Sequence, residues 1–158
     1  GKKFDALAVY LMSGQIAQFY RQASGRYSAG LTFGTDFFES MTEVKSAGAE
    51  MLGAVFPNTA MEDWFAERYQ RAFGNDIQIG FAANSYDFAV LTAATFAAAG
   101  NGRPDAEAVR EGLRNAAPRP APPGKFPFRE SEKGGQFFEF PIVMRKVEND
   151  RIVNLPQK

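Results

Sequence analysis

The sequence predicts an α/β fold built on a parallel, doubly wound sheet. Three short apolar runs, residues 6–11, 31–33 and 51–56, have the composition of buried strands. Between the first two, Ile16 to Ala23 carry apolar side chains at three- and four-residue spacing, which is a helical period. Strands and helices that alternate with short connections are typical of parallel sheets with helices packed on them.

Turn residues separate these first elements. Residues 12–14 (Met-Ser-Gly) end the first strand, and residues 34–36 (Gly-Thr-Asp) end the second. Asp36 followed three positions later by Glu39 fits a capping pattern, which predicts a helix from residue 37 or 38 to about residue 46. Ligands of open α/β sheets bind outside the carboxyl ends of the strands, so these two turns are the first places to look for a site.

The next part of the chain is predicted to be mainly helical. Thr59 and Glu62 form a capping box that opens a helix, and Gly74 ends it. Residues 77–81 are short and extended. Residues 86–99 form a helix that is apolar nearly all round, which is typical of a buried helix.

The last part is predicted to contain one more helix, a connector and a hairpin. Pro104 opens the helix, which runs to about Ala117. The proline-rich residues 118–124 fit neither a helix nor a central strand. After a short extended piece at residues 126–128, residues 137–147 and 152–155 form a β-hairpin.

Composition excludes several classes of function. The 158 residues contain 18 basic and 18 acidic side chains, so no net charge attracts nucleic acid or an anionic membrane. Without cysteine or histidine, the chain has no thiol or imidazole chemistry. It shows no glycine-rich phosphate loop and no cluster of metal ligands. These absences argue against an enzyme, and no cofactor is expected.

Several segments, in this order, resemble a known family. They are residues 4–6 leading to 14–16 and 21–23, then residues 33–37, 48–54, 81–87, 105–113 and 126–128, and the end of the hairpin at 150–153. In this order they resemble the second half of type I periplasmic solute-binding proteins, the branched-chain amino-acid-binding family of ABC importers. The resemblance implies a Rossmann-like lobe sheet, with the chain passing between two α/β lobes.

The resemblance also implies a division of the chain. Residues 1–57 would belong to the second lobe, residues 58–117 would be a helical part of the first lobe, residues 118–125 would be a hinge connector, and residues 126–158 would return to the second lobe. Members of the family are about twice as long. The sheet of the first lobe would then lie outside these residues.

Five residues are candidate ligand contacts, and each has a structural alternative. The resemblance implies that Asp36 holds a ligand ammonium group, whereas the alternative is a helix N-cap. Met12 stands where the family usually has an aromatic residue and would form a polarizable wall. Ser13 either bonds the ligand or caps a helix. Phe37 and Phe81 either line the ligand or fill core.

The implied function is capture of an amino acid or related small organic ligand by hinge closure of two lobes. The implied setting is periplasmic, or extracellular and tethered to the membrane, with the permease of an ABC importer as partner. The alternative is a ligand-sensing domain of the same fold that is coupled to a signalling partner.

Overall fold

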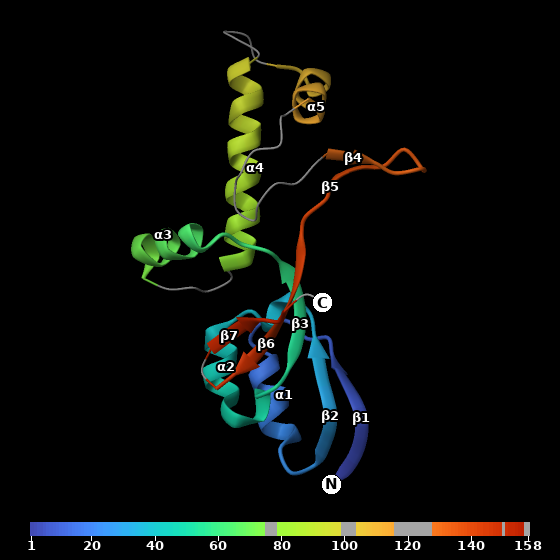
Figure 1. Ribbon diagram of the computed structural model, residues 1–158, viewed down its shortest axis with the longest axis vertical. Helices are drawn as coiled ribbons and strands as arrows, with labels where there is room; N and C mark the ends of the chain where they lie inside the picture. The colour runs from blue at the N-terminus through green and yellow to red at the C-terminus, as the bar shows by residue number, and fades with distance from the viewer. Residues whose placement is uncertain (75–78, 99–103, 116–127, 150, 157–158) are drawn as a thin grey trace. The chain divides into compact units, whose positions relative to one another are not determined.

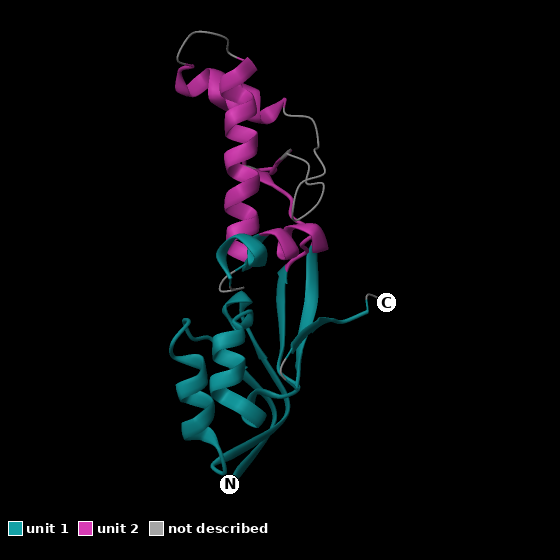
Figure 2. Ribbon diagram, turned by 90° about the vertical axis from the view of Figure 1, so that its left-hand side faces the viewer, with its two compact units in different colours: residues 1–58, 69–79, 142–158 teal, residues 59–68, 80–141 magenta. Residues whose placement is uncertain are grey.

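The computed structural model describes residues 1–74, 79–98, 104–115, 128–149 and 151–156 (Figure 1). The chain divides into two compact units, which Figure 2 shows in different colours. Unit 1 comprises residues 1–58, 69–79 and 142–158, and unit 2 comprises residues 59–68 and 80–141.

Unit 1 is built on a five-stranded sheet with the strand order β1-β2-β3-β6-β7. In this order the strands span Lys2–Val9, Tyr27–Gly34, Val55–Thr59, Ile142–Glu148 and Arg151–Asn154. Thr59, the last residue of β3, belongs to unit 2. β1, β2 and β3 pair in parallel, whereas β6 and β7 form an antiparallel hairpin. The predicted parallel α/β sheet is therefore confirmed. The C-terminal hairpin is confirmed only from Ile142 onward, because Gln136–Phe138 at the start of its predicted first strand form a separate strand, β5, that pairs with β4 (Phe128–Glu130).

The helices α1 and α2 lie on the same side of this sheet (Figure 2). α1 (Ile16–Ala23) joins β1 to β2, and three short helices, η1 (Asp36–Phe38), α2 (Met41–Ala47) and η2 (Gly48–Met51), join β2 to β3. Their apolar side chains meet the sheet in one core. Its buried members are Val9, Ile16, Ala17, Tyr20, Phe38, Val44, Ala47, Met51, Ala54, Phe56 and Val147.

The segment after β2 differs from the single helix that the sequence predicts. Asp36 is the first residue of η1, and α2 begins only at Met41. Ser40 caps α2, because its hydroxyl accepts a 3.3 Å hydrogen bond from the backbone N–H of Glu43. The predicted capping pair of Asp36 and Glu39 is therefore wrong. Ser40 and Glu43 supply the same three-residue spacing four positions later.

β3 begins later than the apolar run at residues 51–56 predicts. Met51 belongs to η2 and is buried in the core from there. The strand instead continues beyond Phe56 and includes Pro57. Val55 lies opposite Phe33, and β2 ends one residue after Phe33. Pro57 therefore lies past the end of β2 and removes no hydrogen bond from the ladder with that strand.

Unit 2 is mainly helical. It contains the start of α3 (Asp63–Phe73), α4 (Ile79–Ala98) from its second residue onward, α5 (Ala106–Arg114), and the antiparallel strands β4 (Phe128–Glu130) and β5 (Gln136–Phe138). α5 starts two residues after Pro104, and Asp105 caps it by accepting a 2.8 Å hydrogen bond from the backbone N–H of Ala108.

Two of the predicted helix starts are wrong. Thr59 lies in β3, so α3 begins at Asp63 without the predicted capping box. α4 begins at Ile79, so Phe81 lies in a helix instead of ending an extended segment. A short apolar run fits a strand or a buried helix equally well, which explains the second error. Gly74 ends α3 as predicted, with its N–H bonded to the carbonyl of Gln70 at 2.8 Å. The predicted connector at residues 118–125 lies outside the described residues.

Candidate functional site

The predicted ligand residues of unit 1 come together at one edge of its sheet. Val9 and Gly34 are the last residues of the parallel strands β1 and β2, and they are register partners. The chain therefore leaves both strands at the same edge. Met12 and Ser13 follow β1 there, and Asp36 follows β2. The carboxyl ends of neighbouring parallel strands are where open α/β sheets bind their ligands.

The turn after β1 presents its side chains to solvent. Met12 is 57% exposed, and its carbonyl accepts a 3.0 Å hydrogen bond from the backbone N–H of Gln15. Ser13 is also exposed. The N-cap of α1 is Gln15 and has no side-chain cap, so the predicted capping role of Ser13 is wrong. The turn thus offers a thioether and a hydroxyl at the strand end.

Asp36 is half-buried at the start of η1. Thr35, not Asp36, is the N-cap of η1, so the predicted N-cap alternative is wrong for this residue. The Asp36 carboxylate has no hydrogen-bond or ion-pair partner among the residues that the structure describes. A carboxylate in such a position can accept charge-assisted hydrogen bonds from a ligand cation.

The aromatic candidates lie in different surroundings. Phe37 is half-buried and packs against the core of unit 1, next to the fully buried Phe38. Phe81 lies in α4 of unit 2 and is 40% exposed. Phe37 therefore contributes at least partly to core packing. The ligand-binding role of both residues stays a prediction.

Glu43 holds the turn after β1 in place, and sequence reasoning missed it. Its buried carboxylate accepts a 2.6 Å hydrogen bond from the backbone N–H of Ala17 through Oε2, and a second one from the backbone N–H of Gly14 through Oε1. A negative charge at a helix N-terminus is favourable because of the helix dipole. The only signal in the sequence is the Ser40-x-x-Glu43 pattern, which predicts a cap for α2 but not a contact with α1.

A buried polar cluster holds the chain immediately after η1. The Glu39 carboxylate accepts a hydrogen bond from the Asn58 side-chain amide and forms an ion pair with Arg145 of β6. All three side chains are buried. Burial lowers the pKa of the Arg145 guanidinium from its ordinary value, because desolvation disfavours the charged form. The cluster ties the segment that carries Asp36 to β3 and β6.

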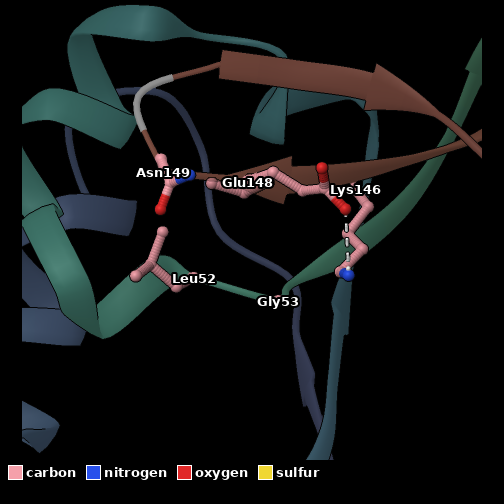
Figure 3. A pocket seen from close by; sticks show the side chains of 6 residues that line it. Leu52, Gly53, Lys146, Glu148 and Asn149 are labelled. Carbon is pink, nitrogen blue, oxygen red and sulfur yellow. Dashed lines mark hydrogen bonds and ion pairs between the residues drawn. The ribbon is translucent and has the colours of Figure 1, made fainter.

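Two cavities of unit 1 lie away from this edge. One, of about 360 Å³, is lined by Leu52, Gly53, Lys146, Val147, Glu148 and Asn149, and Figure 3 shows it beside the Lys146–Glu148 pair. The other, of about 250 Å³, is lined by Leu7, Phe19, Tyr20, Ala23, Tyr27, Ser28, Ala29, Thr32, Glu50 and Leu52. Neither is lined by a predicted ligand residue.

Two further features of the described part of the chain bear on function. In that part, no group of three or more acidic side chains is placed to hold a metal ion. Among the same residues, no helix combines the length and the apolar character needed to cross a membrane.

Comparison with known proteins establishes which fold this is. Neither a protein-family model nor a curated protein sequence matches the chain. Solved structures do match. The leucine-binding protein LivK of Thermotoga maritima has 19% identity and a TM-score of 0.73, over 96% of this chain and 44% of its own.

Two other solved structures match nearly the whole chain with similar TM-scores. LivJ, the substrate-binding protein of a branched-chain amino acid transporter of Streptococcus pneumoniae in complex with isoleucine, has 19% identity and a TM-score of 0.72, over 98% of this chain and 46% of its own. An extracellular ligand-binding receptor of Rhodopseudomonas palustris has 20% identity and a TM-score of 0.74, over 96% of this chain and 48% of its own.

The chain thus spans less than half the length of each of these proteins. A type I periplasmic binding protein of Bordetella pertussis matches in the same way, with a TM-score of 0.71 over 97% of this chain and 46% of its own. These 158 residues therefore have the α/β fold of type I periplasmic solute-binding proteins, over somewhat less than half of such a protein's length.

Proposed function

We propose that this chain is part of an extracytoplasmic solute-binding protein that captures an amino acid, or a related small organic ligand, for the permease of an ABC importer. The observation that carries the proposal is the position of the half-buried residue Asp36 at the edge where β1 and β2 both end, with a carboxylate that has no partner among the described residues. The names of the similar proteins, which bind leucine or isoleucine, support the ligand class.

Each proposed contact has its own chemistry. Asp36 accepts hydrogen bonds from the ligand ammonium group, and the charge on both partners strengthens those bonds. Met12 supplies a polarizable apolar wall, and Ser13 supplies a hydroxyl. Phe37 follows Asp36 in η1 and packs against the core of unit 1, and its contact with the ligand rests on the resemblance to the family. The role of Phe81, in unit 2, stays a prediction that rests on the resemblance to the family.

The proposal assigns binding and release to the protein and no chemical step. Capture by closure of two lobes, and a periplasmic or membrane-tethered location, belong to the proposal. The identity of the protein's partner distinguishes the proposed role in import from a role of the same fold in sensing. A permease that is retained with the protein during purification from its native membrane supports import, and a retained signalling protein in its place supports sensing.

Thermal unfolding with a panel of amino acids tests the proposal. The experiment uses the longest native protein that carries these 158 residues. A ligand present at 100 times its Kd stabilises a protein by about 2.7 kcal/mol, which raises Tm measurably. We expect one class of amino acids to raise Tm, and the Asp36→Asn variant to lose that rise.

The Asp5→Asn variant is the matched control, because Asp5 is exposed and lies in the first half of β1, away from the strand end that leads to Met12 and Ser13. It should keep the full ligand-dependent rise in Tm. The proposal fails if Asp36→Asn also keeps it, or if only ligands without an amine stabilise the protein.

A further inference from the structure

The proposed contacts of unit 1 come from two separate segments at the edge where β1 and β2 end. The turn after β1 carries Met12 and Ser13, and η1 after β2 carries Asp36. Side chains from two segments can bind one small molecule only if the segments keep a fixed position relative to each other. Whatever holds the turn against the segment after β2 therefore bears on affinity.

Met12 and Gln15 close the turn after β1 with two hydrogen bonds. The N–H of Met12 donates to the side-chain Oε1 of Gln15 at 3.3 Å, and the N–H of Gln15 donates to the carbonyl of Met12 at 3.0 Å. Gly14 lies between them with a φ of 90°. Glycine has more backbone freedom than any other residue, so the turn needs a further restraint at Gly14 to keep one conformation.

Glu43 supplies this restraint from α2. Its Oε1 accepts a hydrogen bond from the N–H of Gly14, and its Oε2 accepts one of 2.6 Å from the N–H of Ala17 in the first turn of α1. An ionised carboxylate is acceptor-only, which suits a position between two N–H donors. Glu43 is 5% exposed, so water competes little for these bonds. One buried side chain thus fixes both the turn and the start of α1.

The same side chain links the turn to the segment that carries Asp36. The helices α1 and α2 pack side by side on one face of the sheet (Figure 2), and α2 begins at Met41, shortly after Asp36. The hydroxyl of Ser40 accepts a hydrogen bond from the N–H of Glu43 and so fixes the start of α2. The position of the turn relative to Asp36 is therefore set through Glu43.

We propose that Glu43 is a positioning residue of the binding site. It acts through the turn, by holding Met12 and Ser13 where one small molecule can contact them and Asp36 together. A turn that is fixed before the ligand arrives loses little freedom on binding, which raises affinity. This inference rests on the proposed function, because it concerns the same site.

The Glu43→Gln variant tests the proposal in the longest native protein that carries these residues. The amide keeps the shape of the side chain but turns its own N–H₂ group toward one of the two N–H donors, so at least one hydrogen bond is lost. Calorimetry measures the Kd of the amino acid that raises the parent's Tm most. We expect Glu43→Gln to weaken it about tenfold or more. Hydrogen exchange over residues 12–17 of the ligand-free protein should also become faster.

Two control variants separate positioning from a loss of stability or of charge. Val44→Ala shortens the buried neighbour of Glu43 in α2 and leaves the carboxylate in place. Glu50→Gln removes the same charge from an exposed carboxylate that accepts a 2.6 Å hydrogen bond from the hydroxyl of Ser24, at the other end of α1. Both controls should bind the same amino acid within about twofold of the parent's Kd.

A Glu43→Gln variant that binds as tightly as the parent overturns the proposal. An equal loss of affinity in Val44→Ala also overturns it, because affinity would then follow stability. If no amino acid binds the parent, the proposed function fails, and the exchange rates alone decide on Glu43. Faster exchange over residues 12–17 in Glu43→Gln than in Val44→Ala supports the restraint, and equal rates overturn it.

Discussion

At the scale of single residues, Gly34 shows how packing shapes the strand end that leads to Asp36. A Cβ atom at this position would collide with the ring of Phe38, which is fully buried. The backbone of β2 and the first turn of η1 therefore approach each other more closely than any side chain at residue 34 would allow. The glycine is required by this close approach and not by its backbone angles.

Replacing Gly34 by alanine should lower the free energy of unfolding by about 1–3 kcal/mol, because the methyl group overpacks the core. Urea denaturation measures the loss. A second variant, Phe38→Leu, leaves room for the methyl group. The double variant should lose less stability than the two single losses summed, with a coupling of at least about 0.5 kcal/mol. Additive losses would show that the collision with Phe38 is not the cause.

Asp87 is a buried acid that the proposed function does not use. It is 1% exposed in α4, and neither of its carboxylate oxygens has a hydrogen-bond partner among the described residues. Burial raises its pKa from 3.8 to about 7, because desolvation disfavours the charged form. Between these two values the folded protein holds the proton and the unfolded chain releases it. Stability from this group is therefore lost as pH rises from about 4 to about 7.

The Asp87→Asn variant should remove this pH dependence. We expect it to match the parent protein near pH 4 and to be the more stable of the two at pH 8. The difference should grow by at most about 1.4 kcal/mol per pH unit in between. Urea denaturation at several pH values measures it, with Asp5→Asn as an exposed control. An Asn variant that is less stable than the parent at pH 8 would show that the carboxylate has a partner.

At the scale of elements, the ion pair of Glu39 and Arg145 holds the chain after η1 against β6. Both side chains are buried, so removing one charge leaves the other in a poorly solvated position. Glu39→Gln should therefore cost about 3–5 kcal/mol of unfolding free energy. The same change at Glu148, whose 3.1 Å pair with Lys146 is about one-third exposed, should cost less than about 1 kcal/mol. Equal losses in urea denaturation would contradict this account of the cluster.

The elements that the sequence predicts best are those with a clear local pattern. β1 and β2 follow from short, nearly all-apolar runs, α1 follows from a helical stripe, and the hairpin of β6 and β7 follows from two extended runs around a turn. The errors have physical causes. Met51 is buried although it lies in η2, so the apolar run that predicts β3 starts too early. The first residues of α4 are also apolar, so the sequence predicts a strand where the helix begins.

The site was predictable only in part. The rule on strand ends locates Met12, Ser13 and Asp36 at one edge, because it depends on the order of the elements alone. The groups that hold this edge, Glu39 and Glu43, were missed. Glu43 contacts residues 26 and 29 positions away, and Glu39 contacts Asn58, 19 positions away. Patterns of local spacing carry no information about such contacts.

At the scale of the whole molecule, the chain has the α/β fold of type I periplasmic solute-binding proteins. The described residues reproduce the matched part of known solute-binding proteins almost completely, at 19–20% identity. The matched part is less than half of the length of each similar structure. Binding experiments therefore use the longest native protein that carries these 158 residues.

The most direct test of the account is a crystal structure of that native protein with the amino acid that raises its Tm most. The account predicts that the ligand's ammonium nitrogen lies within about 3.2 Å of an Asp36 carboxylate oxygen, beside Met12 and Ser13. A ligand whose ammonium group is held by other residues, with the Asp36 carboxylate facing solvent, would contradict it.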